Sequence, residues 1–193
     1  MTDIELVFNV AVAWDEWSHD PMFPFEPGCC LNGSRVVMEV LRDLGVRAKP
    51  VSVQFVLFNA FGWSAYEAGV PVAEWPHAAW SVGVGPNMEP PSNPDRWRGH
   101  LMLEGSDWLL DISARQFHRP GRINVETPLI LPTTLPPDGW SISHGSNGNV
   151  LMIARFPANN LWREAAGWKR PHVAERTELT RRVQRVLERN TDD

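Results

Sequence analysis

The chain has 193 residues, of which 43% are hydrophobic, so it can bury the core of one domain without support from disulfides or metal ions. Its formal net charge of −5 argues against a nucleic-acid partner, because phosphate binding requires clustered positive charge. No stretch reaches the roughly 18 to 20 apolar residues of a membrane span, and the acidic first residues lack a signal-peptide pattern, so we expect no membrane partner. The two cysteines, Cys29 and Cys30, are adjacent, which excludes a disulfide framework and predicts a reducing, cytoplasmic setting.

The first predicted element is a helix over residues 3–18, followed by a loop at 21–28 whose prolines forbid regular structure. The clearest helix follows at 30–44, and Gly45 ends it. Its apolar residues fall at helical spacing: Val36, Val37, Val40, Leu41 and Leu44. Residues 51–58 then have the apolar, β-branched and aromatic composition of a buried strand.

The middle of the chain predicts an aromatic-rich excursion at 59–78 and a strand at 80–84. Two further strands, 99–103 and 108–113, flank a tight turn, and 129–132 is a candidate short edge strand. These segments indicate a sheet whose neighbouring strands are joined mostly by short connections.

The last third predicts a hairpin between 141–144 and 150–156, because Asn147-Gly148 is a strong turn signal. An amphipathic helix follows at 173–189. A helix first and then a mostly antiparallel sheet indicate an α+β fold, and we expect a single domain over residues 1–193.

The hairpin between the strands at 99–103 and 108–113 predicts a pairing of His100 with Asp111. A two-residue turn centred on Gly105 and Ser106 places His100 directly opposite Asp111 on one face. The other face then matches apolar residues, Leu101 with Leu110 and Leu103 with Trp108. A carboxylate beside an imidazole fixes the ring tautomer and favours its charged form, although such a pair can also serve only to satisfy two buried polar groups.

Cys30 opens the predicted helix after the proline-rich loop. A helix N-terminus favours the thiolate, which is the nucleophilic form of cysteine. The alternative for a lone helical cysteine is a small buried hydrophobe.

These residues resemble the transglutaminase-like family of cysteine enzymes over about residues 30–115. The resemblance rests on Gly28-Cys29-Cys30, on Val40-Leu41-Arg42-Asp43-Leu44-Gly45-Val46-Arg47-Ala48, and on the segments that carry His100 and Asp111. Arg42 lies twelve and Gly45 fifteen residues after Cys30, as in the family pattern, so Cys30 and not Cys29 matches the nucleophile. The chain departs from the family at Leu101, where an aromatic residue is usual, and at Ser34, where a small residue is shifted or replaced.

The resemblance implies a transglutaminase-like or papain-like core, with the catalytic cysteine at a helix N-terminus packed on a mostly antiparallel sheet. It implies acyl transfer or hydrolysis of an amide or ester in a peptide, protein or small molecule, through Cys30, His100 and Asp111 and without a cofactor or a metal. The alternative is a binding or assembly protein that keeps the fold, has an inert triad and uses its tryptophan-rich surface.

Other candidates carry less weight. Zinc held by the two cysteines, His100 and Asp111 is disfavoured, because adjacent cysteines rarely share one ion and no Cys-x-x-Cys spacing exists. Two amides, Gln54 and Gln116, are candidates to donate to an oxyanion, although a plain surface or core role is the simpler expectation for both. Four histidines in loop-like contexts are expected to be solvated: His77, His118, His144 and His172.

Overall fold

The computed structural model describes residues 1–25, 30–84, 99–125, 127–131, 134–158 and 160–191, and it has an α+β fold. In this part the helices are α1 (Asp3–Ser18), α2 (Cys30–Asp43), α3 (Ala60–Glu67), α4 (Ala166–Lys169) and α5 (Val173–Thr191). The strands are β1 (Lys49–Phe58), β2 (Ser81–Val84), β3 (His100–Glu104), β4 (Leu109–Asp111), β5 (Leu129–Leu131), β6 (Ser141–His144) and β7 (Val150–Arg155). The predicted long helices and the predicted strands are confirmed, each within two residues at either end.

The ends of the first two helices follow from their local sequence. Thr2 caps α1 in a capping box, in which its hydroxyl accepts from the Glu5 backbone and the Glu5 carboxylate accepts from the Thr2 backbone. α2 ends at Asp43, and Gly45 follows with a φ of 84° in the left-handed region, after which Val46 donates to the Leu41 carbonyl at 2.9 Å. α2 is therefore a helix of fixed length, with Cys30 as its first residue.

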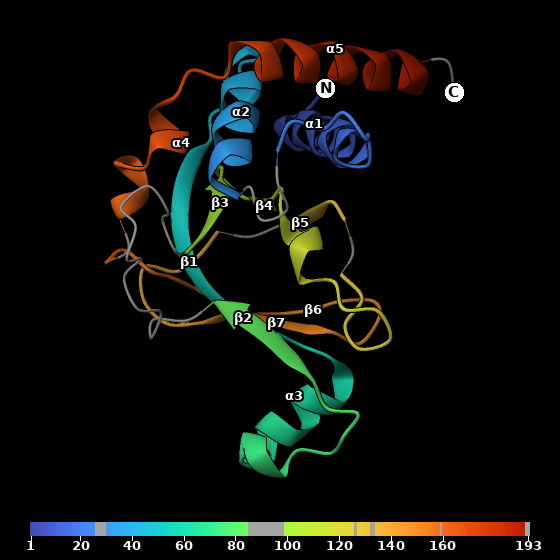
Figure 1. Cartoon of the computed structure of the whole chain (residues 1–193), viewed down its shortest axis with the longest axis vertical. Coiled ribbons are helices and arrows are strands. Elements are labelled where there is room, and N and C mark those ends of the chain that lie inside the picture. The colour runs from blue at the N-terminus through green and yellow to red at the C-terminus, as the bar shows by residue number, and fades with distance from the viewer. Residues whose placement is uncertain (26–29, 85–98, 126, 132–133, 159, 192–193) are drawn as a thin grey trace.

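The strands form one antiparallel sheet, in the order β5-β4-β3-β1-β7-β6 among the described residues, with β2 paired to β1 outside this path. The long strand β1 organises the sheet, because β3 pairs with its first half and β2 with its second half along the same edge. β7 lies along the other edge of β1 and continues into β6 through the predicted hairpin. β5 ends the order, as expected for an edge strand (Figure 1).

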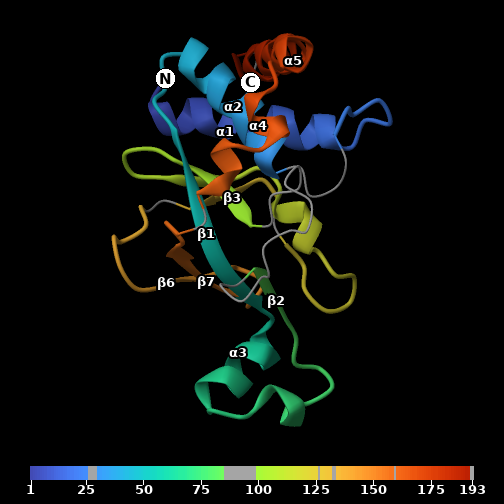
Figure 2. The same cartoon turned by 60° about the vertical axis from the view of Figure 1, so that its left-hand side comes forward.

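The long helices gather over one part of the sheet, with α5 lying across α1 and α2 (Figures 1 and 2). α2 packs directly against β3, and its buried residues join those of α1 and α5 in one core. A second apolar core includes Val53, Phe55, Met102 and Leu109 from the sheet. Cys30 belongs to neither core and instead packs with Leu101 and Trp162.

The predicted register of the hairpin between β3 and β4 is wrong by two residues. Leu103 lies opposite Leu110, where the predicted partner was Trp108, and Glu104 lies opposite Leu109. The turn accordingly runs from Gly105 to Trp108, whose carbonyl accepts from the Gly105 N–H at 2.9 Å. The Trp108 ring lies over Gly105, where an added Cβ would meet the ring at 2.1 Å, so the indole is held at the turn and cannot face Leu103.

A shift of two residues keeps every side chain on its face of the sheet. Asp111 therefore lies diagonally across from His100 on the same face, and a diagonal pair remains within reach of long side chains. The physical prediction that the two residues share a face is confirmed, while the direct pairing is not.

The aromatic-rich excursion contains α3 and a 3₁₀ turn at Val72–Glu74, and it extends from the end of the sheet that is far from α5 (Figure 2). Asn59 anchors it, since its side-chain oxygen accepts from Gly62 and Trp80 and its amide donates to Ala78. Phe61 and Tyr66 are nonetheless exposed on this excursion.

Candidate functional site

The centre of the candidate site is a buried pair between the first residue of β3 and the last residue of β4. His100 Nε2 lies 2.6 Å from Asp111 Oδ2, and the two residues are only 1% and 4% exposed. The other carboxylate oxygen, Oδ1, accepts from the backbone N–H of Ser113 at 2.8 Å and from its hydroxyl at 3.1 Å. Asp111 is thus held by its own chain in an orientation that serves His100.

Aromatic rings flank the imidazole. The centroids of Phe55 and Phe117 lie 5.0 and 5.1 Å from that of His100, both in edge-on geometry. These rings keep water from His100 and restrict its rotation, so the nitrogen that faces Asp111 is fixed.

The surroundings of His100 act on its pKa in opposite directions. Burial lowers the pKa, but the charge and hydrogen bond of Asp111, together with a hydrogen bond that the ring donates to the Cys30 sulfur, raise it to about 10 overall. The ring therefore carries a proton at neutral pH. A protonated imidazole between a carboxylate and a cysteine side chain is suited to stabilise a thiolate.

Cys30 approaches this ring from the first turn of α2. It is 5% exposed, packs on Leu101 and Trp162, and its Sγ lies 3.9 Å from the Gly99 carbonyl oxygen. The free N–H groups at the start of α2 add a second source of stabilisation for negative charge on sulfur. The structure thus brings the three predicted residues Cys30, His100 and Asp111 together, whereas Cys29 lies outside the described residues.

The position of Cys30 depends on a close approach one turn further along α2. Gly33 faces the Trp14 ring and the Ile112 side chain, which an added Cβ would meet at 2.6 and 2.5 Å. The Trp14 indole N–H also donates to the Ile112 carbonyl at 2.9 Å, so Trp14 ties α1 to the segment after β4. Gly33 is therefore the small residue that this contact requires, and Ser34 is a separate, fully buried neighbour.

Gly33→Ala is expected to lower the free energy of unfolding by about 1–3 kcal/mol through overpacking. At an open helical position the same change would raise stability by up to about 1 kcal/mol, so the sign reports the contact with Trp14. Urea unfolding of the variant measures this change in the free energy of unfolding. Gly167→Ala is not a suitable control, because its added Cβ would meet Asn32. An unchanged or higher unfolding free energy would show that the helix does not need this close contact.

Ser113, which the sequence analysis did not name, and Gln116, which it named as a candidate oxyanion donor, complete the hydrogen bonding of the site. The Ser113 hydroxyl donates to Asp111 and accepts from Gln116 Nε2 at 3.0 Å, and the same amide nitrogen lies 3.5 Å from His100 Nδ1. Ser113 lies two residues after Asp111, the spacing at which an Asp side chain commonly accepts from a backbone N–H. This spacing was the available sequence signal for Ser113. Gln116 lies in a 3₁₀ turn, Ala114–Phe117, that carries no periodic pattern.

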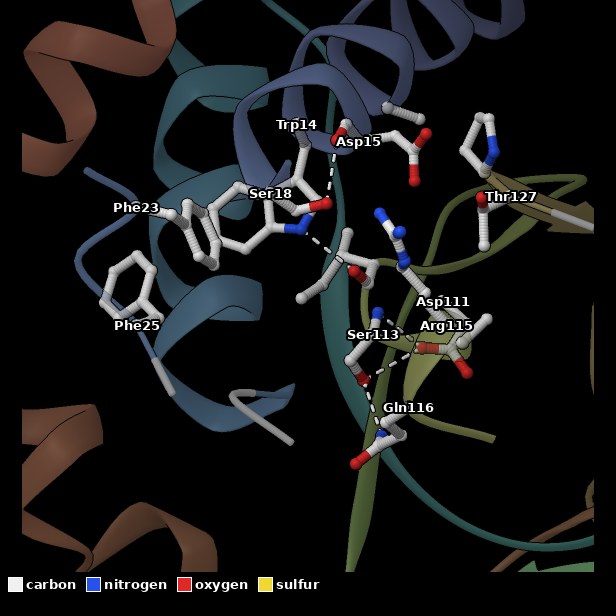
Figure 3. Close-up of a pocket in the computed structure, with 14 residues that line it drawn as sticks. Trp14, Asp15, Ser18, Phe23, Phe25, Asp111, Ser113, Arg115, Gln116 and Thr127 are labelled. Atoms are coloured by element: carbon white, nitrogen blue, oxygen red, sulfur yellow. Dashed lines mark hydrogen bonds between the residues drawn. The ribbon is translucent and has the colours of Figure 1, made fainter. Parts of the chain in front are cut away.

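Gln116 also borders a cavity of about 310 Å³ between α1 and the segment after β4. Figure 3 shows Trp14, Phe23 and Phe25 on one side of this cavity, with Ser113 and Gln116 on the other. The site is therefore next to open space with an aromatic wall.

The remaining candidates lie elsewhere. His77, His118 and His144 are exposed as expected, but His172 is buried, which corrects the expectation that it is solvated. Its Nε2 lies 2.8 Å from the Gly167 carbonyl and its ring packs against Phe25, so it is a structural residue of the segment before α5. Gln54 lies in β1 opposite Ala154.

In the described part of the chain, no group of three or more His, Cys, Asp or Glu side chains is arranged to hold a metal ion. Within the same residues, no helix combines the length and the apolar character needed to cross a membrane. Comparisons with protein-family models, with curated proteins and with solved structures found no match. The geometry of Cys30, His100 and Asp111 is therefore the observation that bears on the function of this protein.

Proposed function

We propose that the protein is a cysteine-dependent acyl-transfer or hydrolytic enzyme with a transglutaminase-like, papain-like core. The observation that carries this proposal is the buried His100–Asp111 pair, with Cys30 hydrogen-bonded to the same ring from the first residue of a helix. A packed hydrophobic cysteine requires neither a protonated imidazole nor a helix terminus beside it.

In the proposed reaction the Cys30 thiolate attacks the carbonyl carbon of an amide or ester, and the carbonyl electron pair moves to oxygen. The imidazolium of His100 then gives its proton to the leaving amine or alcohol as the bond from carbon to that group breaks. A thioester on Cys30 remains. Water or an amine attacks it, His100 accepts the proton of that nucleophile, and the thiolate leaves, which gives hydrolysis or acyl transfer. Substrates of this chemistry are peptides, proteins or small amides and esters, and a reducing cytoplasm keeps the thiol available.

Labelling of Cys30 by iodoacetamide at pH 6 tests this proposal. An ordinary thiol, with a pKa near 8.5, is more than about 99% protonated at that pH, whereas a thiolate paired with His100 reacts to stoichiometry. Mass spectrometry of the labelled peptide locates the modification, and Cys30→Ala, which keeps Cys29, is the matched control. Labelling no faster than that of a free thiol would contradict the proposal.

That negative result would favour a second candidate, a binding or assembly protein with an inert triad. The observation behind it is the excursion at 59–78, where Phe61 and Tyr66 are 63% and 47% exposed. Large exposed aromatic side chains on one projecting segment are typical of contact surfaces.

A further inference from the structure

One amide N–H of Gln116 is only weakly hydrogen-bonded and lies beside the reacting groups. A primary amide has two N–H donors, and one of those of Gln116 donates to the Ser113 hydroxyl at 3.0 Å. Among the residues that the structure describes, the second has only His100 Nδ1 at 3.5 Å, beyond the 2.7–3.2 Å of a good N–H donor. This donor is therefore oriented by Ser113 and only weakly engaged.

This second N–H of Gln116 lies on the side of the His100 ring that contacts the thiol. Asp111 occupies Nε2 at 2.6 Å, so the hydrogen bond between Cys30 and the ring falls to Nδ1, the nitrogen beside Gln116. When a carbonyl carbon is bound to the Cys30 sulfur, its oxygen lies two bonds from that sulfur, which itself contacts Nδ1.

The amide of Gln116 also faces open space. It borders the cavity of about 310 Å³ whose opposite wall is formed by Trp14, Phe23 and Phe25 (Figure 3). Ser113 is bound to Asp111 and to Gln116 at once, so the carboxylate that orients His100 also fixes the direction of the amide.

We propose that the side-chain amide of Gln116 donates a hydrogen bond to the oxyanion that forms when Cys30 attacks a substrate carbonyl. This inference rests on the proposed function. As the S–C bond forms and the carbonyl electron pair moves to oxygen, Nδ1 carries the proton and offers no lone pair, so the Gln116 N–H is free for the new anion. When the intermediate collapses, the oxygen regains its double bond, the leaving group takes the Nδ1 proton, and the donor loses its charged partner. The hydrogen bond is therefore strongest in the transition state, where it accelerates the reaction.

The test compares acylation with alkylation in Gln116→Met, which keeps the length of the side chain and removes the donor. Acylation is followed as the burst of p-nitrophenol from p-nitrophenyl acetate, which passes through an oxyanion. Alkylation by iodoacetamide displaces iodide and forms no oxyanion. We expect Gln116→Met to slow the burst by about 10²-fold, the lower end of the roughly 10²–10³ range for a lost oxyanion donor, and to leave the alkylation rate within threefold of wild type.

Gln184→Met, an exposed glutamine on α5, is the matched control and should change neither rate. Equal bursts from wild type and Gln116→Met would overturn this inference alone. A parallel fall in both rates would also overturn it, because Gln116 would then act only by positioning His100 or Cys30. A wild-type protein without a Cys30-dependent burst would overturn the proposed function together with this inference. Preserved alkylation shows in the same experiment that the variant is folded around the site.

Discussion

Replacing His100 by leucine is expected to abolish the labelling of Cys30 at pH 6 and to lower the free energy of unfolding by about 3–5 kcal/mol. The substitution leaves the Asp111 carboxylate, 4% exposed, without its positive partner, and the Ser113 donors alone do not compensate a buried charge. Cys30 meanwhile loses the imidazolium that stabilises the thiolate. The position itself suits an apolar side chain, because Phe55 and Phe117 flank it.

A second variant separates the loss of stability from the loss of reactivity. In His100→Leu/Asp111→Asn both charges are gone, and the asparagine oxygen can still accept from the Ser113 N–H. We expect most of the stability to return, since an apolar replacement of a buried ion pair is often neutral, while Cys30 stays unreactive at pH 6.

Urea unfolding at pH 7 and the rate of iodoacetamide labelling measure the two effects in the same samples. A loss of stability below about 1 kcal/mol in His100→Leu would contradict the buried charge pair, because that is the size of a surface ion pair. Wild-type labelling in either variant would show that His100 does not activate the thiol.

Sequence patterns predicted the elements well, because periodicity, prolines and turn residues are local signals. They did not give the register of the β3–β4 hairpin, which depends on how one side chain packs. The Trp108 ring lies over Gly105 and moves the turn by one residue, and no spacing of apolar residues reveals that contact. An error of two residues leaves each side chain on the same face of the sheet, so the predicted contact between His100 and Asp111 was still correct.

The site shows the same division. Cys30, His100 and Asp111 were predicted from a helix start and a hairpin, both of which are visible in sequence. Ser113 and Gln116 act through a 3₁₀ turn, and the fit of Gly33 against Trp14 joins two helices. His172 was misjudged because its loop-like sequence context gave no sign that Phe25 covers it. Contacts between segments that are distant in sequence decide these features.

Replacing Asp111 by asparagine is expected to move the pH dependence of Cys30 alkylation to higher pH. Burial lowers the pKa of His100, but the Asp111 carboxylate outweighs it and helps to raise this pKa from the ordinary value of about 6.5 to about 10, so the imidazolium persists to alkaline pH in the wild type. The amide keeps the shape of the side chain and can still accept from Ser113, but it has no charge to favour the protonated ring.

The rise of the alkylation rate with pH should therefore occur at higher pH in the variant, because a thiolate forms less readily beside a ring that binds its proton less tightly. The raised pKa of His100 also affects the free energy of unfolding. Its stabilising contribution is fully present below about pH 6.5 and is lost as the pH rises through about 10. The difference in unfolding free energy between wild type and Asp111→Asn should therefore be larger at pH 6 than at pH 10.

Rates of iodoacetamide labelling between pH 4 and pH 10, with urea unfolding at both ends of that range, give the full profile. Asp107→Asn, at the exposed turn of the same hairpin, removes an equal charge away from His100 and should leave the profile unchanged. We expect Asp111→Asn to retain part of its acylation activity, because an amide can still orient an imidazole by hydrogen bonding, whereas Cys30→Ala has none. Identical profiles for wild type and Asp111→Asn, both with a single midpoint near the ordinary thiol value of about 8.5, would mean that the buried pair does not activate Cys30. The pair would then serve only to join β3 to β4, and the aromatic excursion at 59–78 would become the main candidate for function.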